Sequence, residues 1–474
     1  MASVAERVQR LLEREAPAEG IHPVPPERRT LSGLDLAVLW GDLSVGLLVM
    51  VTGALLVTAF GLSLPQAMLA IVVGGAIGCL PLALVALAGQ REGVPTMVLF
   101  RPILGERGSF AASAVNLVQL VGWTAVEFWA MAQVANVASS RLFGFDAPGV
   151  WVAVIAVLCT GLALGGPIVV IRRWLERFGI YVLIGSAVWI TVEVLLAGDL
   201  GTLWRARGSG GAPFWLAVDL VIVMPVSWLP LAADYTRFAR PGARPVLATY
   251  ASFFVGNTWF YALGVLLALA AQASADAVGV GTSIVALAGG AVVIVALLVG
   301  ESDNAFADIY SAAVSTQNVV PDVSQRGLIA IVGAVGFALA LVFSMERYEL
   351  FLLLLGSVFV PLFGLFAADF LLGRLRVGTG TASRSPGTRW FAFVPWVLGF
   401  AVYHWCAPTG PAAWVDGVRS FFADTLSLPF PLFGSRLGAS IPSFVVAFGL
   451  GLVLLRGRGG DERAGDGAAT PVTR

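Results

Sequence analysis

The chain contains no lysine, two histidines and three cysteines among 474 residues, and these shortages exclude several functions. His22 and His404 lie far apart, and neither an HExxH nor a GxSxG motif occurs, so the sequence offers no zinc-protease or hydrolase centre. Cys79, Cys159 and Cys406 stand in apolar runs, which is typical of small core residues rather than disulfides or metal ligands. The 29 arginines balance 29 acidic residues, so nothing indicates nucleic acid as a partner. We therefore expect neither an enzyme nor a cofactor.

Charge is scarce in this chain, whereas long apolar runs are abundant. Charged residues make up 12% of the sequence and hydrophobic residues 58%, with a mean hydropathy of +0.87. A soluble domain carries roughly twice that charged fraction, and an apolar run of about 20 residues can cross a bilayer as one helix. The sequence thus predicts an all-α polytopic membrane protein with twelve transmembrane helices, in contact with the lipid bilayer. The expected spans are 36–60, 64–88, 109–140, 150–171, 178–198, 213–237, 245–272, 283–314, 327–344, 348–373, 390–407 and 439–456.

The arginines test this count, because cytoplasmic loops of membrane proteins are rich in basic residues. With the N-terminus in the cytoplasm, 23 of the 29 arginines fall in the N-terminal segment, the loops after even-numbered spans and the C-terminal tail. The six on the other side are Arg141, Arg205, Arg207, Arg347, Arg419 and Arg436. With a wrong span count, arginine-rich and arginine-poor loops would not alternate in this way along the chain. We predict a multi-pass protein of a bacterial-type plasma membrane with both termini in the cytoplasm.

Three carboxylates, Glu301, Asp303 and Asp308, interrupt the apolar run that begins at Ser283. An unpaired ionisable residue inside a membrane helix costs about 3 kcal/mol or more, so such residues indicate a functional site. The alternative is that the helix ends at Gly300 and that the acids lie in a hydrated loop.

If the helix continues, its polar side chains fall on two faces. At 100° per residue, Glu301, Asn304 and Asp308 lie within about 60° of one another. Ser302 and Asp303 project elsewhere, with Asp303 about 200° from Glu301. Two faces could serve two ligands, or one ligand and one structural pair.

Helix-breaking residues stand in spans one and six. Pro225 and Pro230 lie inside span six on either side of Ser227, and they predict an unwound segment near the bilayer midplane. The alternative is a simple proline kink packed against a neighbour. Span one contains Asp42 and several glycines, including Gly46, near its start. Interrupted helices at corresponding positions of two halves indicate the binding site of a transporter.

One face of span three carries a ring and several polar groups. Asn116, Gln119, Trp123 and Glu127 follow i, i+3, i+7, i+11 spacing, which places them on the same side of a helix. A flat heterocycle could stack on the Trp123 indole while its N–H groups bond to the Glu127 carboxylate. The alternative is a polar seam between helices in which the indole only fills space.

The sequence also contains recognisable motifs. The sixth-span segment reads MPVSWLPLAADYTRFARPG, and its residues 234–238 form an acid–aromatic–Thr–Arg–Phe run. Further similar positions are Arg101, Gly105, Gly108, Ser109, Asn116, Gly122, Trp123 and Glu127. In these motifs the chain resembles the nucleobase:cation symporter-1 family, the purine–cytosine permeases, over residues 28–456. It is most similar to the branch of hydroxymethylpyrimidine and cytosine transporters.

The resemblance implies a fold and its subdivision. The fold is a 5+5 inverted-repeat core, like that of the neurotransmitter:sodium symporters, plus two C-terminal helices. Its segments are a cytoplasmic N-terminal segment (1–33), two five-helix repeats (34–200 and 201–376), the two additional helices (377–456) and a disordered cytoplasmic tail (457–474).

The resemblance also implies a substrate site between spans three, six and eight. Trp123 is then the stacking residue of span three, with Glu127 as its polar partner and Gln119 one turn before it. Trp228 is the aromatic residue of span six, with Met224 as the alternative and Ser227 beside it. Asp308 takes the place of a span-eight amide that contacts substrate.

A cation site between spans one and eight is implied in the same way. On this chain it involves Leu43 and Gly46 from span one and Ser302 and Asp303 from span eight. Asp303 departs from the family pattern, which has a hydroxyl there. A carboxylate binds Na⁺ through a hard oxygen, or carries a proton instead, so both Na⁺ and H⁺ remain candidates, with Na⁺ favoured by the family.

The predicted function is the cation-coupled import, by alternating access, of a nucleobase-like heterocycle. Ionised Glu127 and Asp308 only accept hydrogen bonds, which favours ligands rich in N–H donors. We therefore expect an aminopyrimidine, hydroxymethylpyrimidine or cytosine. The alternative is a symporter of the same fold for another purine, an allantoin- or hydantoin-type compound or another small solute. The sequence leaves the oligomeric state open.

Overall fold

The computed structural model describes residues 20–165, 179–287, 289–343, 348–373 and 387–456. Every regular element within those ranges is helical, apart from a single bridge between Leu31 and Ala239. This confirms the predicted all-α class. The segment before residue 20, the end of the fourth predicted span and the tail from residue 457 lie outside the described residues.

A helix or a broken pair of helices stands at each of the twelve predicted spans within the described ranges. These elements are α2 (Gly33–Asp42) with α3 (Leu47–Thr58), α4 (Leu64–Glu92), α7 (Glu106–Phe143), α8 (Pro148–Gly165), α10 (Ile180–Ala197), α12 (Phe214–Trp228) with α13 (Ala232–Thr236), α14 (Ala243–Ala270), α16 (Gly290–Val319), α17 (Gln325–Ala340), α18 (Tyr348–Leu371), α19 (Phe393–Cys406) and α21 (Ser440–Arg456). Shorter helices connect them: α5 (Thr96–Leu99), α6 (Arg101–Leu104), α11 (Leu200–Arg205), α15 (Ala277–Ala286) and α20 (Ala412–Arg419). In the described part of the chain, six helices satisfy the length and hydropathy of a membrane span by themselves, and the α2–α3 pair makes a seventh.

The eighth span differs from its prediction at its start and agrees with it at Gly300, where the sequence left an alternative. It begins at Gly290 rather than Ser283, because Ser283 belongs to the separate helix α15. The turn between the two helices needs Gly289, whose φ of +70° is a left-handed conformation that favours glycine. At the other end α16 runs through Gly300 without interruption, so the alternative of a hydrated loop is wrong.

Spans one and six are both interrupted, as predicted, but not in the same manner. The axes of α2 and α3 meet at 56°, and residues 43–46 form the break. In span six, α12 continues through Pro225, and the chain then tightens into a 3₁₀ turn, η3 (Leu229–Leu231), around Pro230. The predicted unwinding of span six is therefore wrong. The chain stays helical there, because a 3₁₀ turn accommodates Pro230, which has no N–H to donate.

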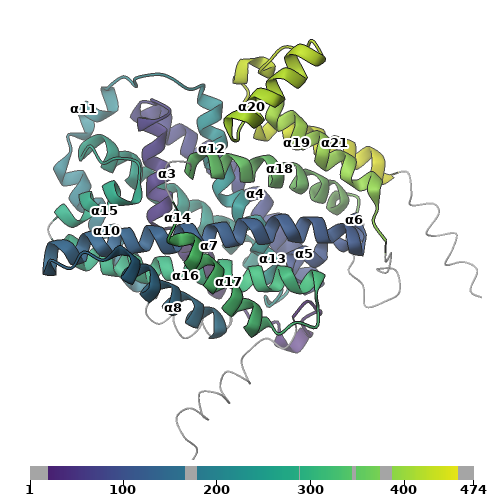
Figure 1. Ribbon diagram of the computed structural model, residues 1–474, viewed down its shortest axis with the longest axis horizontal. Helices are drawn as coiled ribbons and strands as arrows, with labels where there is room; N and C mark the ends of the chain where they lie inside the picture. The colour runs from purple at the N-terminus through teal and green to yellow at the C-terminus, as the bar shows by residue number, and fades with distance from the viewer. Residues whose placement is uncertain (1–19, 166–178, 288, 344–347, 374–386, 457–474) are drawn as a thin grey trace, which may run out of the picture.

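The interrupted spans lie at the centre of the bundle. Within its apolar window, 94% of span six is buried, against 28% for α8. The long helix α7 crosses the molecule and packs along α16, while α18, α19 and α21 lie together on one side (Figure 1). This arrangement surrounds the breaks in spans one and six with α7 and α16, the two helices that carry the polar faces noted in the sequence.

Candidate functional site

A narrow cavity lies where spans one, three, six and eight meet. Its lining residues are Leu43, Leu48, Val49, Trp123, Glu127, Met224, Ser227, Trp228, Glu301, Asn304 and Asp308. The cavity has a volume of about 20 Å³, which is room for one water molecule. A heterocycle can therefore enter only when the lining side chains move apart.

Five of the six expected substrate residues line this cavity: Trp123, Glu127, Ser227, Trp228 and Asp308. Met224, the alternative to Trp228, also lines it. The face of α16 that carries Glu301, Asn304 and Asp308 meets the face of α7 that carries Trp123 and Glu127. The helical spacing thus predicted which side chains share a face of each helix, and the family resemblance implied that the two faces meet.

Gln119 is the exception, because its side chain reaches span six instead of the cavity wall. Its Nε2 donates to the backbone carbonyl of Ser227 at 2.9 Å and to Asn116 Oδ1 at 3.1 Å. The carbonyl of Ser227 lies at the end of α12, where the regular helical bonding stops. Gln119 therefore satisfies an acceptor that the break exposes.

The two indoles of the cavity are held by other aromatic rings. Trp123 packs edge-on against Phe351 and Tyr348, with ring centroids 5.3 and 6.1 Å apart. Trp228 packs edge-on against Trp40 at 6.4 Å. These ring contacts fix the orientation of the two indoles in the cavity wall.

Glu301 has a structural role that the sequence did not reveal. Its Oε2 accepts a hydrogen bond of 3.0 Å from the backbone N–H of Leu47, the first residue of α3. A helix N-terminus has free N–H groups and a positive partial charge, so a carboxylate stabilises it. Gly46 makes this approach possible, because a Cβ there would lie 2.5 Å from Glu301 Oε2.

The carboxyl groups of Glu127 and Glu301 both line the cavity and interact with each other there. Two carboxyl groups can share a hydrogen bond only if one of them carries a proton. Apart from this pairing, Glu127 Oε2, Glu301 Oε1 and Asn304 Oδ1 are buried without a partner among the described residues. Asp308 likewise makes no hydrogen bond within the part of the chain that the structure describes. The acidic and amide side chains of the wall therefore present several acceptor atoms without a partner among the described residues.

Of the four expected cation-site residues, two belong to span one and two to α16. Leu43 and Gly46 belong to the break in span one, beside Glu301. Ser302 and Asp303 lie on the other face of α16, outside the cavity lining. Asp303 is fully buried, whereas Ser302 is half-buried and its Oγ donates to Val299 O at 2.6 Å within its own helix.

A further acid, Asp42, stands beside these residues at the last position of α2. It is 1% exposed, and both of its carboxylate oxygens are buried without a hydrogen-bond partner among the described residues. Asp303 and Glu301 are its electrostatic neighbours. The sequence indicated Asp42 only as a polar residue near the start of span one, because the proximity of α16 is a tertiary feature.

The acid–aromatic–Thr–Arg–Phe run at residues 234–238 joins helices and does not line the cavity. Asp234 accepts a hydrogen bond of 2.9 Å from the backbone N–H of Thr96. Arg237 donates to Tyr310 Oη at 3.0 Å and to the carbonyl of Gly20 at 2.6 Å. The motif thereby connects α13 to α5, to α16 and to the segment that precedes α2.

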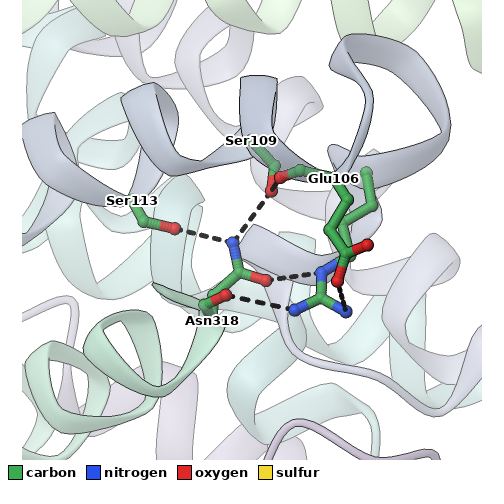
Figure 2. Close-up of polar contacts among 5 residues, drawn as sticks. Glu106, Ser109, Ser113 and Asn318 are labelled. Atoms are coloured by element: carbon green, nitrogen blue, oxygen red, sulfur yellow. Dashed lines mark hydrogen bonds and ion pairs between the residues drawn. The ribbon is translucent and has the colours of Figure 1, made fainter. Parts of the chain in front are cut away.

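A second network joins the end of α16 to the start of α7 (Figure 2). Asn318 Nδ2 donates to Ser109 Oγ at 3.0 Å and to Ser113 Oγ at 2.9 Å. Arg101 Nε donates to Asn318 Oδ1 at 2.7 Å and its Nη2 to the Asn318 carbonyl at 3.1 Å. Glu106 lies 3.8 Å from the same guanidinium. None of these five residues lines the described cavity, so the network fixes helices rather than substrate.

Comparisons with known proteins found relatives in sequence and solved structures of similar fold. A family model described as a permease for cytosine/purines, uracil, thiamine and allantoin matches residues 23–424. The cytosine permease of Escherichia coli K12 is 27% identical over 352 residues, which are 73% of this chain and 80% of that protein. A putative purine-cytosine permease of Bacillus subtilis, YxlA, is 26% identical over 254 residues, 52% of this chain and 53% of that protein.

Two solved structures share the fold. Mhp1, a nucleobase-cation-symport-1 family transporter in a closed conformation with bromovinylhydantoin bound, has a TM-score of 0.76 at 17% identity. The match covers 92% of this chain and 94% of Mhp1. A Na⁺-coupled sialic acid symporter has a TM-score of 0.61 at 14% identity, with 94% and 92% of the two chains covered. The expected polytopic inverted-repeat architecture with two additional helices is thus confirmed.

Proposed function

The chain belongs to the family of permeases for cytosine and purines, uracil, thiamine and allantoin, and from this membership we propose that it imports an aminopyrimidine, either hydroxymethylpyrimidine or cytosine. It is a transporter and not an enzyme, as its relatives are permeases. Transport of a nucleobase-type compound is coupled to a cation, and alternating access follows from the interrupted helices at the centre of the fold.

The acceptor-rich cavity wall carries this proposal. Glu127 and Asp308 stand on facing helices, and Trp123 and Trp228 supply two indoles. Aminopyrimidines offer a flat ring with an exocyclic amino group, whereas uracil presents two carbonyl groups that need donors. In the proposed complex the ring stacks on Trp123, its amino group donates to Glu127 and Asp308, and Ser227 lies at its edge.

A second candidate is a hydantoin- or allantoin-type substrate, or another purine. Two observations support it: the bound bromovinylhydantoin of Mhp1 and the allantoin in the family description. The cavity wall argues against it, because a hydantoin ring carries two carbonyl groups that would face the carboxyl groups of Glu127 and Asp308. Uptake of a labelled hydantoin that exceeded uptake of cytosine would reverse this order.

We place the coupling cation at the break of span one. The proposed ligands are oxygen atoms of Leu43 and Gly46 with Ser302 and Asp303, and Asp42 joins them as a buried carboxylate. The Na⁺-coupled sialic acid symporter of the same fold supports Na⁺ as the coupling ion. H⁺ is the alternative, because a buried carboxyl group can bind a proton in its place.

We also propose the orientation and subdivision that the sequence predicts. Both termini then lie in the cytoplasm of a bacterial-type cell, and the two five-helix repeats occupy residues 34–200 and 201–376. The two additional helices follow within residues 377–456. Labelling of single cysteines introduced at Ser63 and Arg326, on opposite sides in this scheme, tests the orientation.

Transport in proteoliposomes tests the function. We expect labelled cytosine or hydroxymethylpyrimidine to accumulate under a Na⁺ gradient, and uracil to accumulate at least about tenfold less, the effect of one unpaired buried polar group. Glu127→Gln should weaken binding of the aminopyrimidine, whereas Asp424→Asn, at an exposed acid in the short helix η7 (Ser420–Thr425), should not. Preference for uracil, or unchanged affinity in Glu127→Gln, would contradict the proposal.

A further inference from the structure

The charge of the cavity is unbalanced. Three carboxyl groups, those of Glu127, Glu301 and Asp308, belong to its lining, and no basic side chain lines it among the described residues. Charged side chains inside a membrane protein are normally paired, because an isolated ion in a low-dielectric interior costs several kcal/mol. Something must therefore balance the carboxyl groups that stay ionised.

Two of the three carboxyl groups are partly balanced by the protein. Glu301 faces the positive end of α3 through the Leu47 N–H, and its pairing with Glu127 requires one shared proton. The Glu127–Glu301 pair then carries one negative charge, which the positive N-terminus of α3 stabilises. Asp308 has no comparable partner in the described part of the chain.

Arg237 is a basic side chain that contacts α16 only two residues from Asp308, but its hydrogen bonds go to other partners. It donates to Tyr310 Oη, two residues further along α16, and to the carbonyls of Gly20 and Asp234. It is fully buried in that position. Arg237 therefore has other partners and does not line the cavity beside Asp308.

The remaining features of the wall suit a positively charged ring. Trp123 and Trp228 both line the cavity, and an indole face attracts a cation by about 0.5–2 kcal/mol. A carboxylate forms a two-point, charge-assisted bond with an edge that carries a ring N–H⁺ next to an amino group. Three buried acceptor atoms, Glu127 Oε2, Glu301 Oε1 and Asn304 Oδ1, lack other partners among the described residues.

We propose that the transporter binds its substrate as an organic cation, a planar heteroaromatic ring with a protonated ring nitrogen beside an amino group. This inference rests on the proposed function and names the charge state of the substrate. Asp308 provides the counter-charge, and the two indoles cover the faces of the ring. Binding then pairs the Asp308 carboxylate, so neutral rings of the same shape bind less tightly.

The test uses two 4-aminopyrimidines of nearly equal shape, 4-amino-2-methylpyrimidine and its less basic 5-fluoro analogue. Their dissociation constants for the purified protein are measured by calorimetry between pH 6 and pH 8. Above the pKa of the ligand, the cationic fraction falls about tenfold per pH unit. We expect the affinity of each compound to fall in the same proportion, and the fluorinated analogue to bind more weakly by the ratio of the cationic fractions.

Two outcomes separate this inference from the proposed function. Equal affinity of both compounds at every pH would overturn the cationic substrate and leave the aminopyrimidine importer intact. Failure of both compounds to bind, together with no uptake of any aminopyrimidine, would instead overturn the proposed function.

A variant supplies an independent check. Asp308→Asn keeps the size of the side chain and removes its charge, so the difference between the two ligands should shrink to less than about twofold. Asp308→Ser also removes the charge and serves the same purpose if Asp308→Asn does not fold. A difference that persists unchanged in both variants would contradict the proposed role of the carboxylates.

Discussion

The carboxylate of Glu301 accepts a 3.0 Å hydrogen bond from the backbone N–H of Leu47, although the two residues are 254 positions apart in the chain. The bond joins the N-terminus of α3, just after the break in span one, to the middle of α16. Glu301 also lines the cavity, where it faces Glu127. A movement of α16 relative to α3 must therefore change the cavity and the break in the same step, which is what coupled transport requires.

Gly46→Ala should disrupt this contact. The added Cβ would lie 2.5 Å from Glu301 Oε2 and 2.9 Å from Oε1, so the carboxylate must leave the Leu47 N–H. We expect a loss of about 1–3 kcal/mol in stability, the usual cost of overpacking, and loss of transport. Thermal unfolding in detergent and uptake assays measure the two effects.

Gly41→Ala is the matched control for this substitution. Its Cβ would meet only Ser252 Cβ at 3.6 Å, an ordinary contact, and alanine favours the helix over glycine by about 1 kcal/mol. This variant should be as stable as the parent or slightly more stable. If Gly46→Ala behaved like Gly41→Ala, the Glu301 cap would not matter for the fold.

The sequence predicted the cavity well where a single helix determines the outcome. Trp123 and Glu127 share a face of α7, and Glu301, Asn304 and Asp308 share a face of α16, because helical periodicity fixes both relationships. That the two faces meet was inferred from the family resemblance. The structure brings all five side chains to one cavity.

The features that the sequence could not predict depend on contacts between distant segments. Glu301 had no expected role, because its partner Leu47 belongs to another span. Gln119 shares the face of Trp123 but bonds to the end of α12, since the two helices converge there. Gly289 forms the turn between α15 and α16 within an apolar run, so hydropathy alone gave no sign of it.

A substitution of Gln119 tests whether this side chain stabilises the fold or binds the substrate. Gln119→Leu leaves the Ser227 carbonyl without its donor, at a cost of about 1–3 kcal/mol for a buried unpaired group. We expect a lower unfolding temperature, with the dissociation constant for substrate changed less than about threefold. A tenfold or greater loss of affinity at unchanged stability would show instead that Gln119 contacts the substrate directly.

Asp42 should affect stability and coupling in opposite directions. Asp42→Asn removes a buried charge whose two oxygens have no hydrogen-bond partner among the described residues. In the absence of a coupling cation we expect the variant to be more stable than the parent, because a buried unpaired charge is costly. Uptake should lose its dependence on the Na⁺ gradient, or on the pH gradient if H⁺ is the coupling ion. Asp424→Asn is the control, and an unaltered ion dependence in Asp42→Asn would remove Asp42 from the cation site.

The Asn318 network should contribute stability without contributing affinity. Asn318→Ala removes two hydrogen bonds to Ser109 and Ser113 and one from the Arg101 guanidinium, and it leaves that partly buried charge with fewer acceptors. With about 1 kcal/mol for each neutral bond and more for the charged one, we expect a loss of about 2–4 kcal/mol. Substrate affinity should stay within about threefold, because Asn318 does not line the described cavity.

Asn136→Ala is the control for that measurement. Asn136 also bonds through its amide to two groups, Asp146 Oδ1 and the Ala147 N–H, but it lies at the more exposed end of α7. A partly solvated amide is replaced by water at little cost, so this variant should lose no more than about 1 kcal/mol. If Asn318→Ala weakened substrate binding as strongly as it lowered stability, the junction of α16 and α7 would control the cavity itself. The network would then belong to the alternating-access machinery rather than to the static support of the bundle.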